Sequence, residues 1–183
     1  MRHRRRTVYR GVSLSKCLII GYGNPDREDD GVAWHILKAL GERFGRISQM
    51  DASSDDISAI DFGELQHRDD APDLMGELQL MPEIAETIAA YDKVCFVDAH
   101  TGAYPHDVTV TPLHAEFQSS PFTHHLTPET CLDLAKVAYG HSPQGLVISV
   151  RGFRFGFEHT LSAETAALAG EAVEKIVAWV KEQ

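Results

Sequence analysis

The sequence predicts an α/β fold: a three-layer α/β/α sandwich around a mostly parallel five-stranded sheet with one antiparallel edge strand. Short apolar runs alternate with segments of helical period along the chain, which is the pattern typical of such folds. The run 93–99, "KVCFVDA", consists largely of β-branched, aromatic and small apolar residues, as expected of a strand buried on both faces. The chain has 183 residues, 43% of them apolar, which is enough for one domain with a substantial core.

The strands are predicted from apolar runs that end at turn-forming residues. Segment 107–114, "DVTVTPLH", alternates apolar and polar residues, which favours an edge position in the sheet. The other runs are more continuously apolar and favour interior strands. The predicted strands are 17–21, 74–80, 93–99, 107–114 and 145–153.

The helices are predicted from helical period and from their end signals. Thr127 and Ser162 are expected to be N-caps, and Pro128 suits the first helical position. The predicted helices are 29–43, 81–92, 126–140 and 161–183. The first of them carries a continuous apolar face formed by Val32, Ile36, Leu37 and Leu40.

Charge divides the chain into a short basic segment and a long acidic one. Segment 1–16 carries six basic and no acidic residues, and is expected to be a disordered tail or the result of a start codon placed too far upstream. The rest, 17–183, is expected to form one domain with an acidic excursion at 44–73. Without those six charges the formal net charge of −10 falls to −16, which argues against binding to nucleic-acid phosphates.

Cysteine usage and hydropathy indicate the cell compartment in which the protein is expected. The three cysteines are scattered and show no CxxC spacing, which is typical of core residues in a reduced, cytoplasmic protein. No apolar run approaches the roughly 18 residues of a membrane span. Because nothing in the pattern suggests an extensive apolar interface, a monomer is expected.

The turn after the first strand, "GYGNPDREDDG" at 21–31, carries more polar chemistry than a strand–helix connection requires. A dinucleotide fingerprint needs a third glycine where this chain has Asp26, so that interpretation is excluded. Two interpretations of Asp29 and Asp30 stay open. They cap the following helix, or, together with Glu28, they attract a metal ion, because one acid is enough for a cap and three repel one another.

Further candidates lie where ligands gather in such sheets, beyond the carboxyl ends of the strands. They are the segment 79–83 after the second strand, Asp98 after the third strand, and the loop "SSPFTHHLTPET" with its adjacent His124 and His125. Neutral imidazole together with carboxylate suits Ni²⁺ or Zn²⁺, whereas solvated loop histidines are the alternative. The sequence has no G-x-S-x-G elbow and no cysteine in a plausible catalytic turn.

The stretch "GYGNPDREDDGVAWHIL" resembles the opening motif of the nickel–iron hydrogenase maturation proteases, G-x-G-N-x-x-x-x-D-[DE]-G-x-[GA]. Three further segments resemble that family in the same order, so that the resemblance spans about residues 17 to 181. It implies a phosphorylase/hydrolase-like sandwich and an endopeptidase that removes the C-terminal extension of the hydrogenase large-subunit precursor once nickel is inserted. The three segments are "LMGELQLMPEIAETIAAYDKVCFVDAHTG", "FTHHLTPETCLDLAKVAYGHSP" and "LVISVRGFRFGFEHTLSAETAALAGEAVEKIVAWV".

The resemblance also implies site residues. Asp30 and His124 fall on two nickel-recognising and catalytic positions of the family. The third position falls on Gln79, an amide where many relatives carry aspartate, and Glu83 or Asp98 is a possible substitute. The motif further assigns a role in the turn to Gly21, Gly23, Asn24, Asp29 and Gly31.

Nickel is expected to arrive with the substrate, bound near the scissile bond, and other divalent ions can occupy the same site. One alternative to the protease is a nickel-sensing chaperone that binds a metalloprotein precursor without cutting it. Another is a peptidyl-tRNA hydrolase, because "IIGYGNP" also resembles the start of those esterases. This chain lacks the T-R-H-N run of those esterases and the basic face that a tRNA partner needs.

Overall fold

The computed structural model describes residues 15–115 and 126–182 and shows a five-stranded sheet in the order β2-β1-β3-β5-β4. Strand β4 runs antiparallel to β5, and the other neighbouring pairs are parallel. The prediction of a mostly parallel sheet with one antiparallel edge strand is therefore confirmed. The strands are β1 (Cys17–Tyr22), β2 (Asp73–Glu77), β3 (Lys93–His100), β4 (Val108–Leu113) and β5 (Gln144–Arg151).

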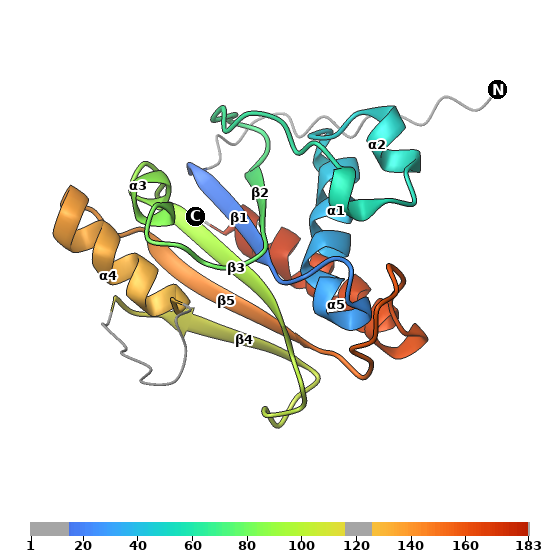
Figure 1. The fold of residues 1–183 in the computed structure, drawn as a ribbon. Helices are drawn as coiled ribbons and strands as arrows, with labels where there is room; N and C mark the ends of the chain where they lie inside the picture. Colours follow the sequence, from blue (N-terminus) through green and yellow to red (C-terminus); the bar gives the residue numbers. More distant parts are fainter. Residues whose placement is uncertain (1–14, 116–125, 183) are drawn as a thin grey trace.

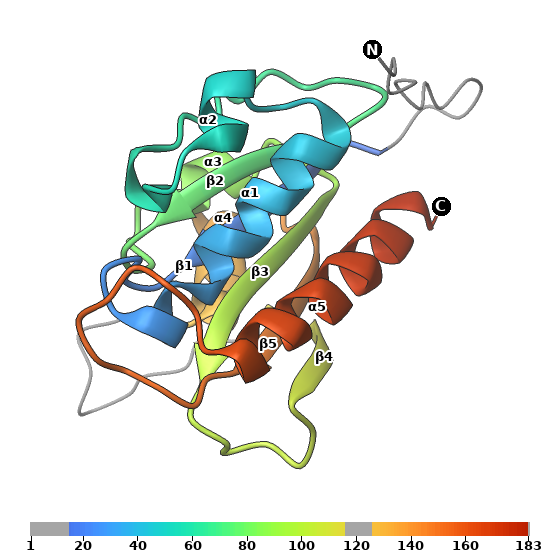
Figure 2. The same ribbon diagram turned by 90° about the vertical axis from the view of Figure 1, so that its right-hand side faces the viewer.

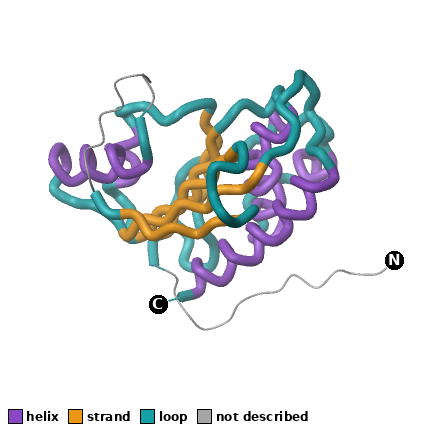
Figure 3. The backbone as a smooth tube through the Cα atoms, turned by 90° about the horizontal axis from the view of Figure 1, so that it is seen from below, coloured by secondary structure: helices purple, strands orange, loops and turns teal. Residues whose placement is uncertain are grey.

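Helices cover both faces of the sheet (Figure 1). The pair α1 and α5 lies on one face, as Figure 2 shows, and α3 and α4 lie on the other. Figure 3, viewed from below, shows the strands between the two helical layers. No helix in the described ranges is long and apolar enough to cross a membrane. The helices are α1 (Val32–Phe44), α2 (Gln49–Ser53), α3 (Ile84–Ile88), α4 (Pro128–Tyr139) and α5 (Ala163–Lys181).

Strand β1 shows why the central runs are continuously apolar. Ile19 packs into the core shared with α1 and α5, whereas Leu18 and Ile20 pack into the core shared with α3 and α4. Side chains alternate between the faces of a strand, and here both faces are covered, so every position must be apolar. All three side chains have no exposed surface.

Several element boundaries differ from the sequence prediction, among them those of α1, β2 and α3. Strand β2 ends at Glu77 instead of residue 80, and α3 is reduced to residues 84–88 of the predicted 81–92. Before α3, the Ile84 N–H donates to the Met81 carbonyl and the Ala85 N–H donates to the Pro82 carbonyl. These i→i+3 hydrogen bonds form tight turns where the first turn of the predicted helix was expected. The predicted N-caps are confirmed: Thr127 and Ser162 each accept a hydrogen bond from the backbone N–H three residues on.

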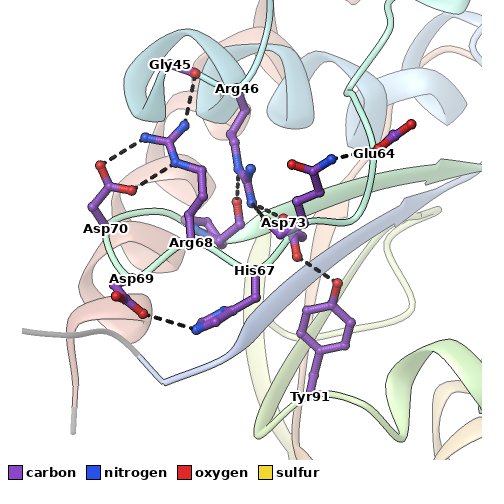
Figure 4. Close-up of polar contacts among 11 residues, drawn as sticks. Gly45, Arg46, Glu64, His67, Arg68, Asp69, Asp70, Asp73 and Tyr91 are labelled. Carbon is purple, nitrogen blue, oxygen red and sulfur yellow. Dashed lines mark hydrogen bonds and ion pairs between the residues drawn. The ribbon is translucent and has the colours of Figure 1, made fainter.

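The excursion 44–73 forms a small satellite layer on α1. It contains α2 and a 3₁₀ turn, Ile57–Ala59, and its Ile57 and Ile60 are buried against Trp34 of α1. At its end, a buried ion pair joins Arg46 to Asp73 (Figure 4). This ion pair ties the excursion to the amino end of β2.

Both carboxylate oxygens of Asp73 are bonded in that cluster. Its second oxygen accepts the Tyr91 hydroxyl at 2.7 Å, and Arg46 Nε donates to the Pro72 carbonyl at 2.7 Å. A buried charge of this kind is tolerated because it is paired and hydrogen-bonded. The cluster therefore has no open coordination position and is structural.

Candidate functional site

The β1–α1 turn is built on glycines where no other residue fits. Gly23 has a φ of +132°, and a Cβ there would lie 2.4 Å from the Asp30 carbonyl oxygen. A Cβ on Gly21 would lie 2.9 Å from Leu37 Cδ1, and one on Gly31 would lie 2.9 Å from Pro25 Cα. The glycines let the chain fold back tightly, so that Asp30 lies close to the end of β1.

Asn24 gives the turn its shape. Its side-chain oxygen accepts the Asp26 N–H at 2.9 Å, and its carbonyl accepts the Arg27 N–H at 3.2 Å. Its own N–H donates to Asp30 Oδ2 at 3.1 Å. The motif asparagine therefore orients the Asp30 carboxylate.

Asp29 does not cap a helix. Helix α1 begins at Val32, after a 3₁₀ turn over Glu28–Gly31, and neither segment has a side-chain cap. Capping by Asp29, one of the two sequence interpretations, is therefore wrong. The physical reason is that the carboxylate is turned toward the loop between β5 and α5, with residues more than 120 positions away.

The Asp29 carboxylate is fully buried and fully hydrogen-bonded. It accepts the N–H groups of Phe153 and Arg154 at 2.8 Å each, and both the N–H and the hydroxyl of Ser162 at 2.7 and 2.8 Å. Burial on its own raises the pKa of Asp29, but these hydrogen bonds together outweigh it and leave the pKa below the ordinary value. Asp29 is thus an ionised structural group.

Glu28 has a similar role on the same loop. Its Oε2 accepts the Gly156 N–H at 2.5 Å, and its backbone N–H donates to the Glu158 carbonyl at 2.6 Å. Glu28 adopts a φ of 46°, an uncommon conformation for a residue with a side chain. Of the three consecutive acids, only Asp30 has a side chain without a described hydrogen bond to the loop after β5.

Asp30 and Asp98 interact at the carboxyl edge of the sheet. Asp98 lies near the end of β3, directly beside the end of β1, and its Oδ1 accepts the Ala99 N–H at 2.7 Å. Burial first, and then the negative charge of Asp30, raise the pKa of Asp98 to about 7, against the opposing effect of its hydrogen bonds. Neither carboxylate has an ion-pair partner within residues 15–115 and 126–182.

Tyr22 and the start of α4 border this pair of acids. Burial and the negative charges of Asp98 and Glu129 raise the pKa of Tyr22 far above its ordinary value. Leu126 packs in the same apolar cluster as Tyr22. His124 and His125 lie outside the described residues, but Leu126 is only two positions beyond His124.

Gln79 and Glu83 are not brought to the acid pair by any described polar contact. Both are exposed on the connection from β2 to α3, and Gln79 Nε2 lies 3.2 Å from Met81 Sδ. Asp98 is the acid that the fold places beside Asp30. Its position directly after the clearest apolar run is the sequence signal that favours it over Gln79.

Tyr22 is a site neighbour that the sequence reasoning missed. The only available signal was a polar hydroxyl at the variable position of G-x-G, where the strand ends. Within the described ranges, no group of three or more His, Cys, Asp or Glu side chains is arranged to hold a metal ion. The structure thus supplies a pair of carboxylates at the carboxyl edge of the sheet.

Solved structures share this fold over nearly their whole length. The [NiFe] hydrogenase maturation protease HycI from Thermococcus kodakarensis matches with a TM-score of 0.61 at 20% identity, covering 97% of this chain and 98% of that chain. The hydrogenase maturating endopeptidase HybD from E. coli matches with a TM-score of 0.61 at 15% identity, covering 91% and 92%. This is the fold of the [NiFe] hydrogenase maturation proteases.

The likeness to the maturation proteases extends to HybD from Thermococcus kodakarensis, with a TM-score of 0.56 at 15% identity, covering 91% of this chain and 99% of that chain. No protein-family model and no curated protein matches the sequence. At these identities the maturation-protease likeness concerns the fold. The resemblance inferred from the opening motif is confirmed at that level.

Proposed function

We propose that this chain is a nickel-dependent endopeptidase that removes the C-terminal extension from the large-subunit precursor of a [NiFe] hydrogenase, in the cytoplasm. The observation that carries the proposal is the meeting of Asp30 and Asp98 at the carboxyl edge of a maturation-protease fold. In open α/β sheets this edge is where ligands bind.

The donor set fits a divalent cation. Two carboxylates without a cationic partner repel each other, and the raised pKa of Asp98 reflects that repulsion together with burial. A bound divalent ion removes the repulsion and holds both groups ionised. An imidazole from His124 would add the nitrogen ligand that favours Ni²⁺ over Mg²⁺ or Ca²⁺.

We assign the residues as follows. Asp30 and His124 contact the nickel that the precursor carries, and Asp98 takes the third position in place of Gln79. A divalent ion in contact with the scissile carbonyl or a water molecule supplies Lewis-acid polarisation. Asp98, whose pKa is raised to about 7, would release its proton to solvent and be held ionised when a cation is bound beside it.

No thiol nucleophile is part of this proposal. All three cysteines, Cys17, Cys95 and Cys131, are buried and unpaired. Burial raises the pKa of each thiol, to about 12 for Cys17 and Cys131. They are therefore protonated and inert near neutral pH.

The first prediction concerns the ligands. Asp30→Asn, Asp98→Asn and His124→Ala should each lower trimming of a nickel-loaded large-subunit precursor by about 100-fold or more, as expected for the loss of a group at the reacting centre. Mass spectrometry of the precursor after incubation measures the loss of the C-terminal peptide. Circular dichroism confirms that each variant is folded.

Gln79→Ala and Cys95→Ser are the matched controls, and both should trim at the wild-type rate. If Gln79→Ala abolishes trimming while Asp98→Asn retains it, the third position belongs to Gln79. If wild-type protein binds the precursor tightly but never shortens it, the protein is a nickel-sensing chaperone and the protease assignment is wrong.

A further inference from the structure

The loop between β5 and α5, residues 152–162, is held firmly to the turn that carries Asp30. Besides the bonds to the Glu28 and Asp29 carboxylates, the Asp29 N–H donates to the Arg154 carbonyl at 3.2 Å. Arg27 Nη2 donates to the Phe155 carbonyl at 3.2 Å. A loop fixed by so many bonds to one short turn has a defined conformation.

This fixed loop nevertheless exposes aromatic side chains. Phe157 is 87% exposed and Phe153 is 43% exposed. The guanidinium of Arg27 lies 5.7 Å from the centre of the Phe157 ring, and that of Arg151 lies 4.8 Å from the centre of the Phe153 ring. Phenylalanine is among the most often buried residues, and exposed aromatic groups gathered beside a site mark an interaction surface.

This surface carries arginine side chains together with the exposed acids Asp26 and Glu158. Arg27 and Arg154 have no carboxylate partner among the residues that the structure describes, although the formal net charge of the chain is −10. Arg27 Nε is shielded from solvent and has no hydrogen-bond acceptor within residues 15–115 and 126–182. The Arg27 guanidinium over the Phe157 ring, and Arg154 in the same loop as Phe157, are complementary to a protein surface that offers carboxylates next to apolar side chains.

We propose that this surface, Phe153, Arg154 and Phe157 together with Arg27, is the docking site for the hydrogenase large-subunit precursor. It binds an apolar patch of the precursor that is flanked by acidic residues. The inference rests on the proposed function, because it takes the precursor as the partner. Exposed aromatic and arginine side chains on a rigid element are the residue types that dominate binding energy at interfaces.

The placement explains why the loop is fixed. Glu28 and Asp29 bind the loop, and Asp30 is the next residue in the chain. A precursor seated on the Phe157 ring is therefore registered against the Asp30 carboxylate. Docking and metal recognition are built on one short turn, so the scissile bond is presented at a set position.

The test compares two double variants in an Asp30→Asn background, in which the bound precursor is not consumed. Biolayer interferometry measures the affinity for the nickel-loaded large-subunit precursor of the same organism. Arg154→Ala with Phe157→Ala should weaken binding by at least 10-fold, as expected for loss of hot-spot side chains. Lys136→Ala with Val137→Ala, which removes an equally exposed basic and apolar pair from the last turn of α4, should leave the affinity within about 2-fold.

Two further readouts separate docking from structure. In the otherwise wild-type protein, the effect of the loop variant should fall on KM for trimming and not on kcat. The affinity of the parent should fall with added salt more steeply than that of Arg154→Ala. The urea midpoints of all variants should match the parent, because the replaced side chains are exposed.

The outcomes distinguish the two proposals. If the wild-type protein trims the precursor and the loop variant trims it with unchanged KM and affinity, docking at this loop is wrong and the protease assignment stands. If the wild-type protein neither binds nor trims the precursor, both proposals are overturned.

Discussion

Burial separates Asp29 from Asp30, although the two are neighbours in the chain. Asp29 is fully enclosed and satisfied by the loop after β5, whereas Asp30 is partly exposed beside Asp98. The sequence could show that Glu28, Asp29 and Asp30 carry more charge than one turn needs. It could not show that Glu28 and Asp29 bind a loop while Asp30 lies beside Asp98, because the partners of Glu28 and Asp29 lie more than 120 residues further along the chain.

The environment of Asp29 predicts an acid-sensitive contribution to stability. Its pKa in the folded state lies below the ordinary value of 3.8, so its stabilisation is fully present above that value and is lost as the pH falls through the folded pKa. Asp29→Asn should therefore lower the free energy of unfolding by about 2–4 kcal/mol at pH 7. The difference from wild type should shrink below about pH 4, as urea unfolding at several pH values will show.

Asp26→Asn is the control for Asp29→Asn, because Asp26 is an exposed acid in the same turn, 3.2 Å from His159 Nδ1. It should change the free energy of unfolding by less than about 1 kcal/mol at pH 7. An Asp29→Asn penalty that does not decline on acidification would contradict the assignment of Asp29 as an ionised anchor.

At the scale of elements, the β1–α1 turn depends on backbone geometry more than on side chains. Gly23→Ala places a methyl group 2.4 Å from the Asp30 carbonyl at a positive φ, and should lower the free energy of unfolding by about 3 kcal/mol. Gly170 lies within α5 with no atom within 4 Å of an added Cβ. Gly170→Ala should raise the free energy of unfolding by about 0.5–1 kcal/mol.

Chemical denaturation of both alanine variants measures these opposite signs. Nickel binding by calorimetry should weaken in Gly23→Ala, because the Asp30 backbone must move, and should be unchanged in Gly170→Ala. A Gly23→Ala protein with wild-type stability and nickel affinity would show that the turn does not need its left-handed glycine.

Most elements could be predicted because their causes are local. The caps at Thr127 and Ser162 and the apolar run of β3 depend on residues a few positions apart. The start of α1 was placed three residues early, because the acids that resemble a helix start are used by a distant loop. The placement of Asp98 near Asp30 also depends on the lateral order of the strands, which no local pattern contains.

At the scale of the molecule, the two ends of the sheet have different tasks. The Arg46–Asp73–Tyr91 cluster lies at the amino end of β2, and the acid pair lies toward the carboxyl ends of β1 and β3. Asp73 and Glu77 open and close β2, which separates the two ends by roughly 13 Å along that strand. Stability at one end and the metal recognition proposed for the other should therefore be separable.

Asp73→Ala should lower the free energy of unfolding by about 3–5 kcal/mol, because it leaves the buried Arg46 guanidinium unpaired. Tyr91→Phe removes only the hydroxyl bond to Asp73 and should cost about 1 kcal/mol. Asp70→Ala, which breaks an exposed pair with Arg68 in the same excursion, should cost less than about 1 kcal/mol.

Urea unfolding measures these three losses, and calorimetry measures nickel binding by the folded variants. Tyr91→Phe and Asp70→Ala should bind nickel as the wild type does. A marked loss of nickel affinity in Tyr91→Phe would show that the two ends of the sheet are energetically coupled.

Gly156 and Glu28 constrain each other across the fold. A Cβ on residue 156 would lie 2.7 Å from Glu28 Oε2, the atom that accepts the Gly156 N–H. A side chain on residue 156 therefore requires the Glu28 carboxylate to move or to be replaced by a shorter group. In an alignment of sequences with this fold, the residues at positions 28 and 156 should covary. This covariation would show that the loop contacts the turn even in relatives whose overall identity is low.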